Sequence, residues 1–432
     1  MKKVLIITYY WPPGSGPGVQ RFLKFSKYLR EFGWDPIILT VENGSYPSID
    51  TSLVKDILEG LKVYKTKTFE PFQWYNILKG KKGKSTGVGM AGMQEQSWLQ
   101  KLALHIRANY FIPDARKGWK KYALKKAKSI IQVEQVDAII TTGPPHSAHL
   151  IGLDLKKQMN LPWVADMRDP WTTVFYNEFF PRTEATKQKD KGLEDLVLQS
   201  ADGVVVVSNG LKQEFSDRND NISIIYNGFD ETDLPLSIPQ RNKRFTISYV
   251  GNLKPNQNVE VLWEVLSEIK KEEIDFSTEL ELFLTGNVDA SVTQSIQLHG
   301  LQDNLNLSPF VAHQEAVHRM MSADMLLFVI PKSERNKLII TGKLFEYLAT
   351  GNSILGIGPV DGDASALLQD ANRESLSDYL DKNSMKSQVL AAYQNWKNEE
   401  SNRVKVGDIK RFSRKGLTEQ LANKLNNLLD EN

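Results

Sequence analysis

Short apolar runs alternate with amphipathic helical segments along this 432-residue chain, and the alternation limits its fold more than any other feature. Residues 4–8 are typical of a strand buried on both faces. Residues 19–32 place apolar side chains at spacings of three and four, which predicts a helix. Gly33 ends this helix, and residues 35–40 predict a second strand. Strand, helix and strand joined by short links indicate a parallel sheet with right-handed crossovers.

The alternation stops at a polar stretch, residues 231–243, and then begins again. Two prolines in this stretch, Pro235 and Pro239, favour a linker. Strands are expected before it at 136–141, 161–165, 202–207 and 222–225, and after it at 245–250, 280–284, 324–330 and 353–357. Two such runs predict an α/β protein with two facing, Rossmann-like, doubly wound parallel-sheet domains, whose ligands bind at the carboxyl ends of the strands.

The chain therefore divides into three expected parts. Residues 1–235 predict an N-terminal domain, and residues 244–405 predict a C-terminal domain. Residues 408–432 predict a terminal amphipathic helix, because leucines recur there at helical spacing (Leu417, Leu421, Leu425, Leu428 and Leu429).

Composition excludes several kinds of protein. The chain has no cysteine, which rules out a disulfide scaffold, a thiolate zinc site, an iron–sulfur cluster and a cysteine nucleophile. The apolar run at residues 4–7 is too short for a signal peptide, and no stretch approaches the roughly 18 apolar residues of a membrane span. These features predict a cytoplasmic protein, either soluble or peripheral at the membrane.

A glycine-rich loop follows the first expected strand. Gly14, Gly16 and Gly18 let the backbone approach a ligand, and the next helix offers N–H groups to an anion. The spacing differs from the dinucleotide-binding fingerprint, and no acidic residue ends the second strand, so a dehydrogenase is disfavoured. A tight connection that binds no ligand is the alternative.

A second candidate lies at residues 341–355. Gly342 enters a short helix whose first turns hold Lys343 and Glu346. A carboxylate there can hold the hydroxyls of a ribose, and loop amides together with a lysine can hold phosphates. An ordinary surface Lys–Glu pair would have the same spacing.

Five stretches of the sequence, in this order, resemble glycosyltransferase family 4. They are residues 9–21, 166–171, 224–230, 249–253 and 343–347, and they span nearly the whole chain. The resemblance implies the GT-B fold, in which two Rossmann-like domains face each other and the C-terminal helix crosses back to the N-terminal domain.

The resemblance also implies how a donor would bind. The backbone at Gly16 and Gly18 would pass near the donor diphosphate, Lys254 would lie against it, and Glu346 would hydrogen-bond the nucleotide ribose. Donor or nucleotide binding is thus expected at Gly16, Gly18, Asn252, Lys254, Thr341, Gly342, Lys343 and Glu346.

A reaction centre is implied near the middle of the N-terminal domain. Arg168 stands where many relatives have a histidine facing the donor sugar, and Asp166 and Asp169 flank it, so the catalytic residues are expected to be Arg168, Asp169 and Asp166. His146 and Trp171 are expected on the acceptor side.

The sequence departs from the family at two points. Leu338 stands where the family has the first Glu of its E-x7-E pair, and the basic residue expected near 256–258 is missing. Arg335, Lys337 and Lys343 remain open as substitutes. No metal or other cofactor is expected, because GT-B members neutralise the leaving diphosphate with basic side chains and helix dipoles. The pair Asp361 and Asp363 is interpreted as a solvated loop.

Basic residues are concentrated at residues 79–128, with 13 Lys or Arg against Glu95 and Asp114. Leu99, Leu102, Ala103 and Ile106 fall on one helical stripe within this tract. Such a stripe beside basic residues fits an anionic membrane surface, and it equally fits an ordinary helix that faces the core. Nucleic acid is disfavoured, since no binding module for it is visible.

Together these features predict a glycosyltransferase of hexosyl type. It would move a sugar from a nucleotide diphosphate sugar to a glycan or lipid-linked acceptor, with retention and without a metal, in cell-surface polysaccharide or glycolipid synthesis. Two alternatives stay open: a nucleotide-sugar-binding protein without transferase activity, and a GT-B sugar-nucleotide epimerase.

Overall fold

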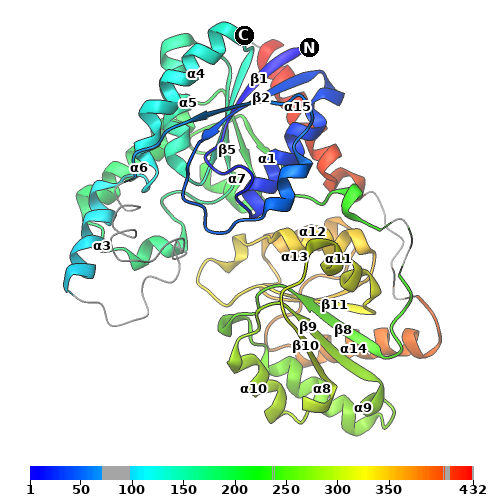
Figure 1. Cartoon of the computed structure of the whole chain (residues 1–432). Helices are drawn as coiled ribbons and strands as arrows, with labels where there is room; N and C mark the ends of the chain where they lie inside the picture. The colour runs from blue at the N-terminus through cyan, green and yellow to red at the C-terminus, as the bar shows by residue number, and fades with distance from the viewer. Residues whose placement is uncertain (71–97, 236, 238, 402, 404–408, 431–432) are drawn as a thin grey trace. The chain divides into compact units, whose positions relative to one another are not determined.

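The computed structural model of the chain forms two compact units, Met1–Asn227 together with Arg414–Asn432, and Gly228–Ser413 (Figure 1). It describes residues 1–70, 98–235, 237, 239–401, 403 and 409–430, without the side chains of Leu99, Gln100, Phe175 and Tyr176. The Lys- and Gly-rich stretch 80–97 lies outside the described residues. Residues 231–243, expected as a linker, lie within the second unit.

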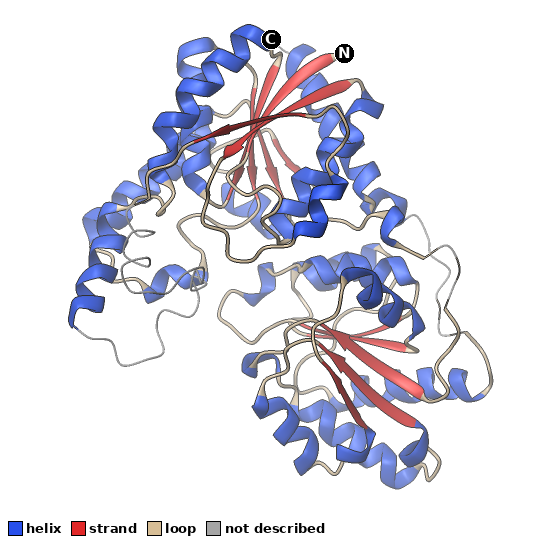
Figure 2. Ribbon diagram, in the orientation of Figure 1, coloured by secondary structure: helices blue, strands red, loops and turns tan. Residues whose placement is uncertain are grey.

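The first unit is built on a parallel sheet of seven strands in the order β3-β2-β1-β4-β5-β6-β7 (Figure 2). The strands are β1 (Lys2–Ile7), β2 (Trp34–Val41), β3 (Lys62–Thr66), β4 (Ala138–Gly143), β5 (Trp163–Met167), β6 (Gly203–Val206) and β7 (Ile222–Ile224). The α-helices are α1 (Pro17–Tyr28), α3 (Trp98–Tyr110), α4 (Lys120–Glu134), α5 (His149–Met159), α6 (Glu184–Ser200), α7 (Asn209–Phe215) and α15 (Arg414–Asp430).

Side chains of β1 alternate between two buried cores, one on each face of this sheet. Leu5 and Ile7 belong to the core that also holds Trp119 and Ala123 of the α4 region. Val4 and Ile6 belong to the core under α1 and α15. The four apolar residues of β1, at positions 4–7, are therefore all buried, as expected for a strand covered on both faces.

The terminal helix α15 packs against α1, and the two chain ends lie close together in Figure 1. Leu417, Leu421, Leu425 and Leu428 are all buried in that core. Trp34 donates a hydrogen bond from Nε1 to Asn426 Oδ1 over 3.2 Å. This confirms the expected return of the C-terminal helix to the N-terminal domain.

The second unit has a parallel sheet of five strands in the order β10-β9-β8-β11-β12. Its strands are β8 (Phe245–Val250), β9 (Leu280–Thr285), β10 (Leu305–Ser308), β11 (Met325–Val329) and β12 (Ser353–Ile357). Its α-helices are α8 (Glu260–Glu272), α9 (Phe276–Glu279), α10 (Ala290–Leu298), α11 (His313–Ser322), α12 (Gly342–Thr350), α13 (Asp363–Asp370) and α14 (Lys382–Lys397). The expected fold class is confirmed.

Two strands escape prediction from the sequence, β3 and β10. Both stand at a sheet edge and are short and largely polar, with the sequences KVYKT and LNLS. The β3 sequence lacks the apolar run or clean alternation that marks a strand, and the alternation in β10 covers only four residues. Their place is set by pairing with β2 and β9.

Of the two interpretations of the stripe on α3, the structure contradicts the core-facing helix for Leu102 and Ile106. Leu102 is 48% exposed and Ile106 is 40% exposed, and they continue a line that includes Trp98 at 71% and Tyr110 at 68%. In contrast, Trp119 and Ala123 in the next segment are buried. None of the helices in the described part of the chain is long and apolar enough to span a bilayer.

Candidate active site

Each sheet has one place where the strand order reverses direction. In the first unit this place lies between β1 and β4, and in the second between β8 and β11. Ligands of doubly wound sheets bind at this point, beyond the carboxyl ends of the strands. The loops after these four strands, with helices α1 and α12, carry nine of the thirteen residues expected from the sequence, and the other four lie on β5 or in the loop after it.

The glycine loop after β1 is held by the chain around residue 48. Ser15 N donates to Ser48 O over 3.0 Å, and Asp50 N donates to Pro13 O over 2.8 Å. Gly16 caps α1 with φ 119°, a left-handed conformation that favours glycine. The loop therefore presents the N-terminus of α1 in a fixed position.

Gly18 is required by Arg168. A Cβ atom on Gly18 would lie 1.8 Å from Arg168 Nη1, so the guanidinium occupies the space where a side chain would be. Arg168 is held from its other side by two acceptors: Nε donates to Thr142 Oγ1 over 3.0 Å, and Nη2 donates to Pro144 O over 2.5 Å. Burial lowers the pKa of Arg168, while the nearby carboxylates of Asp166 and Asp169 raise it.

Asp166 is buried and both of its carboxylate oxygens are occupied. Oδ1 accepts from Arg21 Nε over 3.1 Å and from Arg21 Nη2 over 2.7 Å, and Oδ2 accepts from Thr142 Oγ1 over 2.8 Å. Arg21 is itself fully buried and also donates to Tyr226 O. Asp166 thus orients Arg21, Thr142 and, at 3.9 Å, Arg168.

Sequence reasoning assigned no role to Arg21, although one signal was present. A cation on the apolar face of a helix requires a buried anion, because an unpaired buried charge is costly. The partner, 145 positions away, could not be identified from the sequence.

Asp169 lies at the end of the same loop with its side chain exposed to solvent. It makes no hydrogen bond or ion pair within the described parts of the chain. Of the three residues expected to be catalytic, Asp169 is therefore the carboxylate still available to a ligand.

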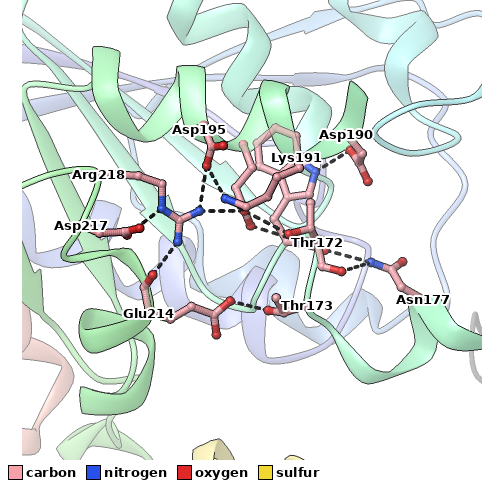
Figure 3. A network of polar contacts seen from close by, with 11 residues as sticks. Thr172, Thr173, Asn177, Asp190, Lys191, Asp195, Glu214, Asp217 and Arg218 are labelled. Atoms are coloured by element: carbon pink, nitrogen blue, oxygen red, sulfur yellow. Dashed lines mark hydrogen bonds and ion pairs between the residues drawn. The ribbon is translucent and has the colours of Figure 1, made fainter. Parts of the chain in front are cut away.

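A polar network fixes the chain that follows Asp169 (Figure 3). Thr172 N and Oγ1 donate to Glu194 over 3.1 and 3.0 Å, and Arg218 Nη1 donates to the same carboxylate over 2.9 Å. Asn177 Nδ2 donates to Trp171 O over 3.1 Å. The loop after β5 is thus attached to α6 at several points.

His146 and Trp171 are stacked, with ring centroids 4.8 Å apart and planes 10° from parallel. Trp171 Nε1 donates to Asp190 Oδ1 over 2.8 Å, which fixes the indole. Neither ring nitrogen of His146 has a hydrogen-bond partner of good geometry in the described chain. Burial, together with His149 and Arg168, lowers the pKa of His146 well below its usual range, while the Pro170 carbonyl opposes the shift.

His149 was not expected to be part of the site. Its Nδ1 lies 2.9 Å from Thr141 Oγ1, and burial lowers its pKa to about 3. Both imidazoles are therefore neutral at neutral pH. They pack over Gly143, where a Cβ would lie 2.5 Å from His149 Nε2.

A cavity of about 140 Å³ lies beside this stack, within the first unit. Its lining includes Arg107 from α3, Pro145 and His146 from the end of β4, and Trp171 and Arg182 from the chain after β5. The structure therefore places His146 and Trp171 together in one cavity wall.

In the second unit, Lys343 lies against the glycine turn after β8. Its Nζ donates to Tyr249 Oη over 2.8 Å and stands 4.3 Å from that ring's centroid. A Cβ on Gly251 would lie 2.5 Å from Lys343 Nζ, and Gly251 has φ 123°. Burial lowers the pKa of Lys343 to about 8, with Glu346 opposing the shift and Lys254 adding to it.

The N-terminus of α12 lies next to Lys343 and has a free hydroxyl. Thr341 Oγ1 is buried and has no hydrogen-bond partner among the described residues. Asn252 and Lys254 are exposed on the loop after β8. Lys332 N donates to Asn256 O over 2.8 Å, which ties this loop to the one after β11. The geometry suits an anion held by an ammonium group, a hydroxyl and helix N–H groups.

Glu346 lies one turn along α12 from Gly342, with His313 Nε2 4.0 Å from its Oε1. Asp233 Oδ2 is 3.6 Å from the same imidazole nitrogen. The carboxylate is 31% exposed and so can still reach a ligand.

Of the three cations left open as substitutes, Lys343 is the one beside the glycine turn. Lys337 instead forms a 2.5 Å ion pair with Asp361 at the surface. Arg335 and Leu338 belong to the loop between β11 and α12, with the Arg335 side chain exposed. In the described part of the chain no group of three His, Cys, Asp or Glu residues is placed to hold a metal ion.

A family model named Glycosyltransferase Family 4 matches residues 91–233. This part of the chain therefore matches a glycosyltransferase family 4 domain, as the resemblance in the sequence predicts. No curated protein sequence matches the chain.

Solved structures share the whole fold at low sequence identity. TarM covers 99% of this chain, and the chain covers 99% of TarM, with a TM-score of 0.62 and 12% identity. The lipopolysaccharide outer core galactosyltransferase WaaB gives 100% and 99% coverage, a TM-score of 0.56 and 13% identity. A putative UDP-N-acetylglucosamine 2-epimerase from Listeria monocytogenes covers 100% of this chain, and the chain covers 98% of it, with a TM-score of 0.56 and 10% identity. At such identities the likeness shows the GT-B fold alone.

Proposed function

We propose that this protein is a hexosyl-type glycosyltransferase that moves a sugar from a nucleotide diphosphate sugar to a glycan or lipid-linked acceptor. The observation that carries the proposal is the second unit's anion site. Lys343, the unpartnered Thr341 hydroxyl and the N-terminus of α12 converge beside the turn at Gly251, where the strand order reverses. TarM of S. aureus, which has the same fold, has been crystallised with UDP.

In this proposal Lys343, Lys254 and the dipole of α12 neutralise the diphosphate as the sugar leaves. Preorganised positive charge at the leaving group is a large contribution to such a reaction. Glu346 binds the ribose and Asn252 lines the same loop. We propose that the reaction proceeds with retention and without a metal, as the family resemblance implies.

The first unit supplies the residues around the acceptor. Arg168 and Asp169 are proposed to act at the reacting sugar, while Asp166 acts through them as a positioning residue. His146 and Trp171 form a wall against which the acceptor packs. Gly18 leaves room for Arg168, and the α1 N-terminus at Gly16 faces the same edge of the sheet.

Membrane contact is proposed through residues 79–128, in a protein of the cytoplasm that attaches peripherally. The exposed line of Trp98, Leu102, Ile106 and Tyr110 on α3 supports it, together with the basic residues of this tract. An apolar stripe flanked by lysines suits an anionic bilayer surface, and it suits an acceptor drawn from cell-surface polysaccharide or glycolipid synthesis.

The test is turnover of a donor panel by the full chain. UDP-, GDP-, ADP- and dTDP-hexoses are incubated with membrane-derived acceptor lipids or without acceptor, with and without a chelator, and the released nucleoside diphosphate and the sugar products are measured. Acceptor-dependent release that survives the chelator is expected. Conversion of the donor sugar without acceptor would instead identify an epimerase, and binding without any turnover would identify a non-catalytic protein.

A further inference from the structure

The cavity in the first unit is lined by three arginines, Arg107, Arg116 and Arg182, and by one carboxylate, Asp114. Aromatic side chains, including Trp171 and Phe180, form much of the remaining wall. The volume of about 140 Å³ holds several water molecules, so a group the size of a phosphate fits.

Two of these arginines already have carboxylate partners. Arg116 Nη1 donates to Glu70 Oε2 over 2.8 Å, and Arg182 Nη1 donates to Asp190 Oδ2 over 2.8 Å. Arg182 still has a buried Nε without a partner in the described chain. One donor of this residue is therefore left for a ligand.

Arg107 is different, because the described residues provide it with no hydrogen bond and no ion pair. Its guanidinium lies 5.7 Å from the centroid of the Phe180 ring. Burial and the charge of Arg116 lower the pKa of Arg107. Two like charges that share a partly buried space repel each other, and an anion between them would relieve this repulsion.

Asp114 does not serve as that anion. Its Oδ1 accepts from Arg116 N over 2.8 Å and from Ser147 Oγ over 2.9 Å, and its Oδ2 accepts from Ser147 N over 2.8 Å. The carboxylate is thus used to fix the backbone at the start of α5.

The wall that carries Arg107 is anchored to the chain that carries Arg182. Asn109 Nδ2 donates to Pro181 O over 2.9 Å, and Asn109 Oδ1 accepts from Thr183 N and Thr186 Oγ1, each over 2.8 Å. The distance between the two arginines is therefore set before any ligand binds, which lowers the cost of binding.

We propose that this cavity is an anion subsite for the acceptor, in which Arg107, helped by Arg116 and Arg182, binds a phosphate group. The inference rests on the proposed function and deepens it, since it names the chemical class of the acceptor. Guanidinium groups bind phosphate oxygens in pairs of parallel hydrogen bonds, and a doubly charged oxyanion matches several arginines better than a neutral hydroxyl does. The phosphate belongs either to a lipid headgroup or to a phosphorylated sugar.

The test is calorimetric titration of the full chain with three probes: octyl phosphate, glucose 6-phosphate and octyl glucoside. Four variants are compared with the wild type. Arg107→Gln removes the unpaired cation, and Arg107→Lys keeps the charge without the two parallel donors of the guanidinium group. Lys157→Gln removes an exposed charge from α5, and Lys343→Gln removes the cation of the second unit. Unfolding temperatures establish that each variant is folded.

At least one phosphate probe should bind the wild type, with octyl glucoside binding more weakly. Arg107→Gln should weaken the binding by about tenfold or more, because a charge-assisted hydrogen bond is lost. Arg107→Lys should weaken it less, and Lys157→Gln should leave it unchanged. Preference for octyl phosphate identifies a lipid source, and preference for glucose 6-phosphate identifies a sugar source.

Three results would overturn the inference: no binding of either phosphate probe, equal binding by Arg107→Gln, or loss in Lys343→Gln alone, which would place the anion in the second unit. Nucleoside diphosphate binding by the second unit is measured separately and does not depend on Arg107. Failure of the subsite and failure of the proposed function are therefore distinguishable.

Discussion

The two units meet the same requirement, positive charge at a reversal of strand order, in opposite ways. In the first unit the charged side chains already have partners within the fold: Arg21 binds Asp166, and Arg168 donates to Thr142 and Pro144. In the second unit Lys343 is largely buried, and its ammonium group donates a hydrogen bond to the Tyr249 hydroxyl and not to a carboxylate. The first arrangement fixes geometry before a ligand arrives, and the second leaves charge available for an anionic ligand.

The largest effect on stability is expected from removing the buried cation of the first unit, Arg21. Arg21→Met leaves Asp166 buried without its partner and should lower the free energy of unfolding by about 3–5 kcal/mol. Denaturant unfolding measures the loss. The control is Lys120→Met, whose 2.9 Å pair with Asp154 is at the surface, and which should change stability by about 0–1 kcal/mol. Equal effects of the two variants would contradict the assigned role of the Arg21–Asp166 pair.

The second unit should respond in affinity and not in stability. Lys343→Gln removes a charge-assisted contact and should weaken nucleoside diphosphate binding by about 1.5–3 kcal/mol, or roughly ten- to a hundredfold, in a titration at pH 7. Lys337→Gln, which loses only the surface pair with Asp361, should bind as the wild type does. Matching affinities for both variants would remove Lys343 from the donor site.

The pH dependence of that affinity tests the same lysine. Burial lowers the pKa of Lys343 to about 8, so the free protein loses this positive charge as the pH rises through that value. Nucleotide affinity should therefore fall between pH 7 and pH 9 in the wild type, and the fall should be much smaller in Lys343→Gln. A wild-type profile that is flat over this range would contradict the assignment.

A substitution at Gly18 tests the position of Arg168, because the guanidinium group occupies the space where a side chain at residue 18 would lie. Gly18→Ala would place a Cβ where Arg168 Nη1 lies and should displace the guanidinium. Donor turnover should fall about tenfold or more, because a small displacement of a group at the reacting centre lowers the reaction rate strongly. The stability change should stay below about 1 kcal/mol, since the end of a side chain can move. Gly192→Ala in α6 meets no atom within 4 Å and should keep full turnover.

The smallest effect is expected at Glu346. Glu346→Ala removes a hydrogen-bond acceptor for the ribose and should weaken nucleotide binding by about 1 kcal/mol, close to fivefold. Glu315→Ala, which removes an exposed pair with Arg319, serves as its control. Unchanged affinity in Glu346→Ala would show that the ribose lies elsewhere.

The difference between the units also explains what could be predicted from the sequence. Lys343 and Glu346 lie three positions apart on one helix, and the glycine turn at Gly251 directly follows a recognisable strand, so each of these two segments can be found from its own sequence. The first site depends on partners far apart in the chain, such as Arg21 with Asp166 and Arg116 with Glu70. No spacing rule predicts such pairs, because the sheet order brings them together.

The fold was more predictable than the site for a related reason. Buried parallel strands such as β1 and β6 are apolar runs and can be identified directly. The polar edge strands β3 and β10 carry no such signal. On α3 the stripe of Leu102 and Ile106 was read correctly as a pattern, but its surroundings decide whether it faces core or solvent.

The most direct test of the central claim is thermal unfolding of the full chain with UDP, GDP, ADP, CMP and dTDP, each with and without a chelator. A nucleotide at 100 times its dissociation constant adds about 2.7 kcal/mol of stability, and each kcal/mol raises the Tm of a domain near 200 residues by about 2–4 °C. The account predicts such a rise with one nucleoside diphosphate, unaffected by the chelator. Absence of a rise with all five nucleotides would contradict a nucleotide-sugar donor site in the second unit.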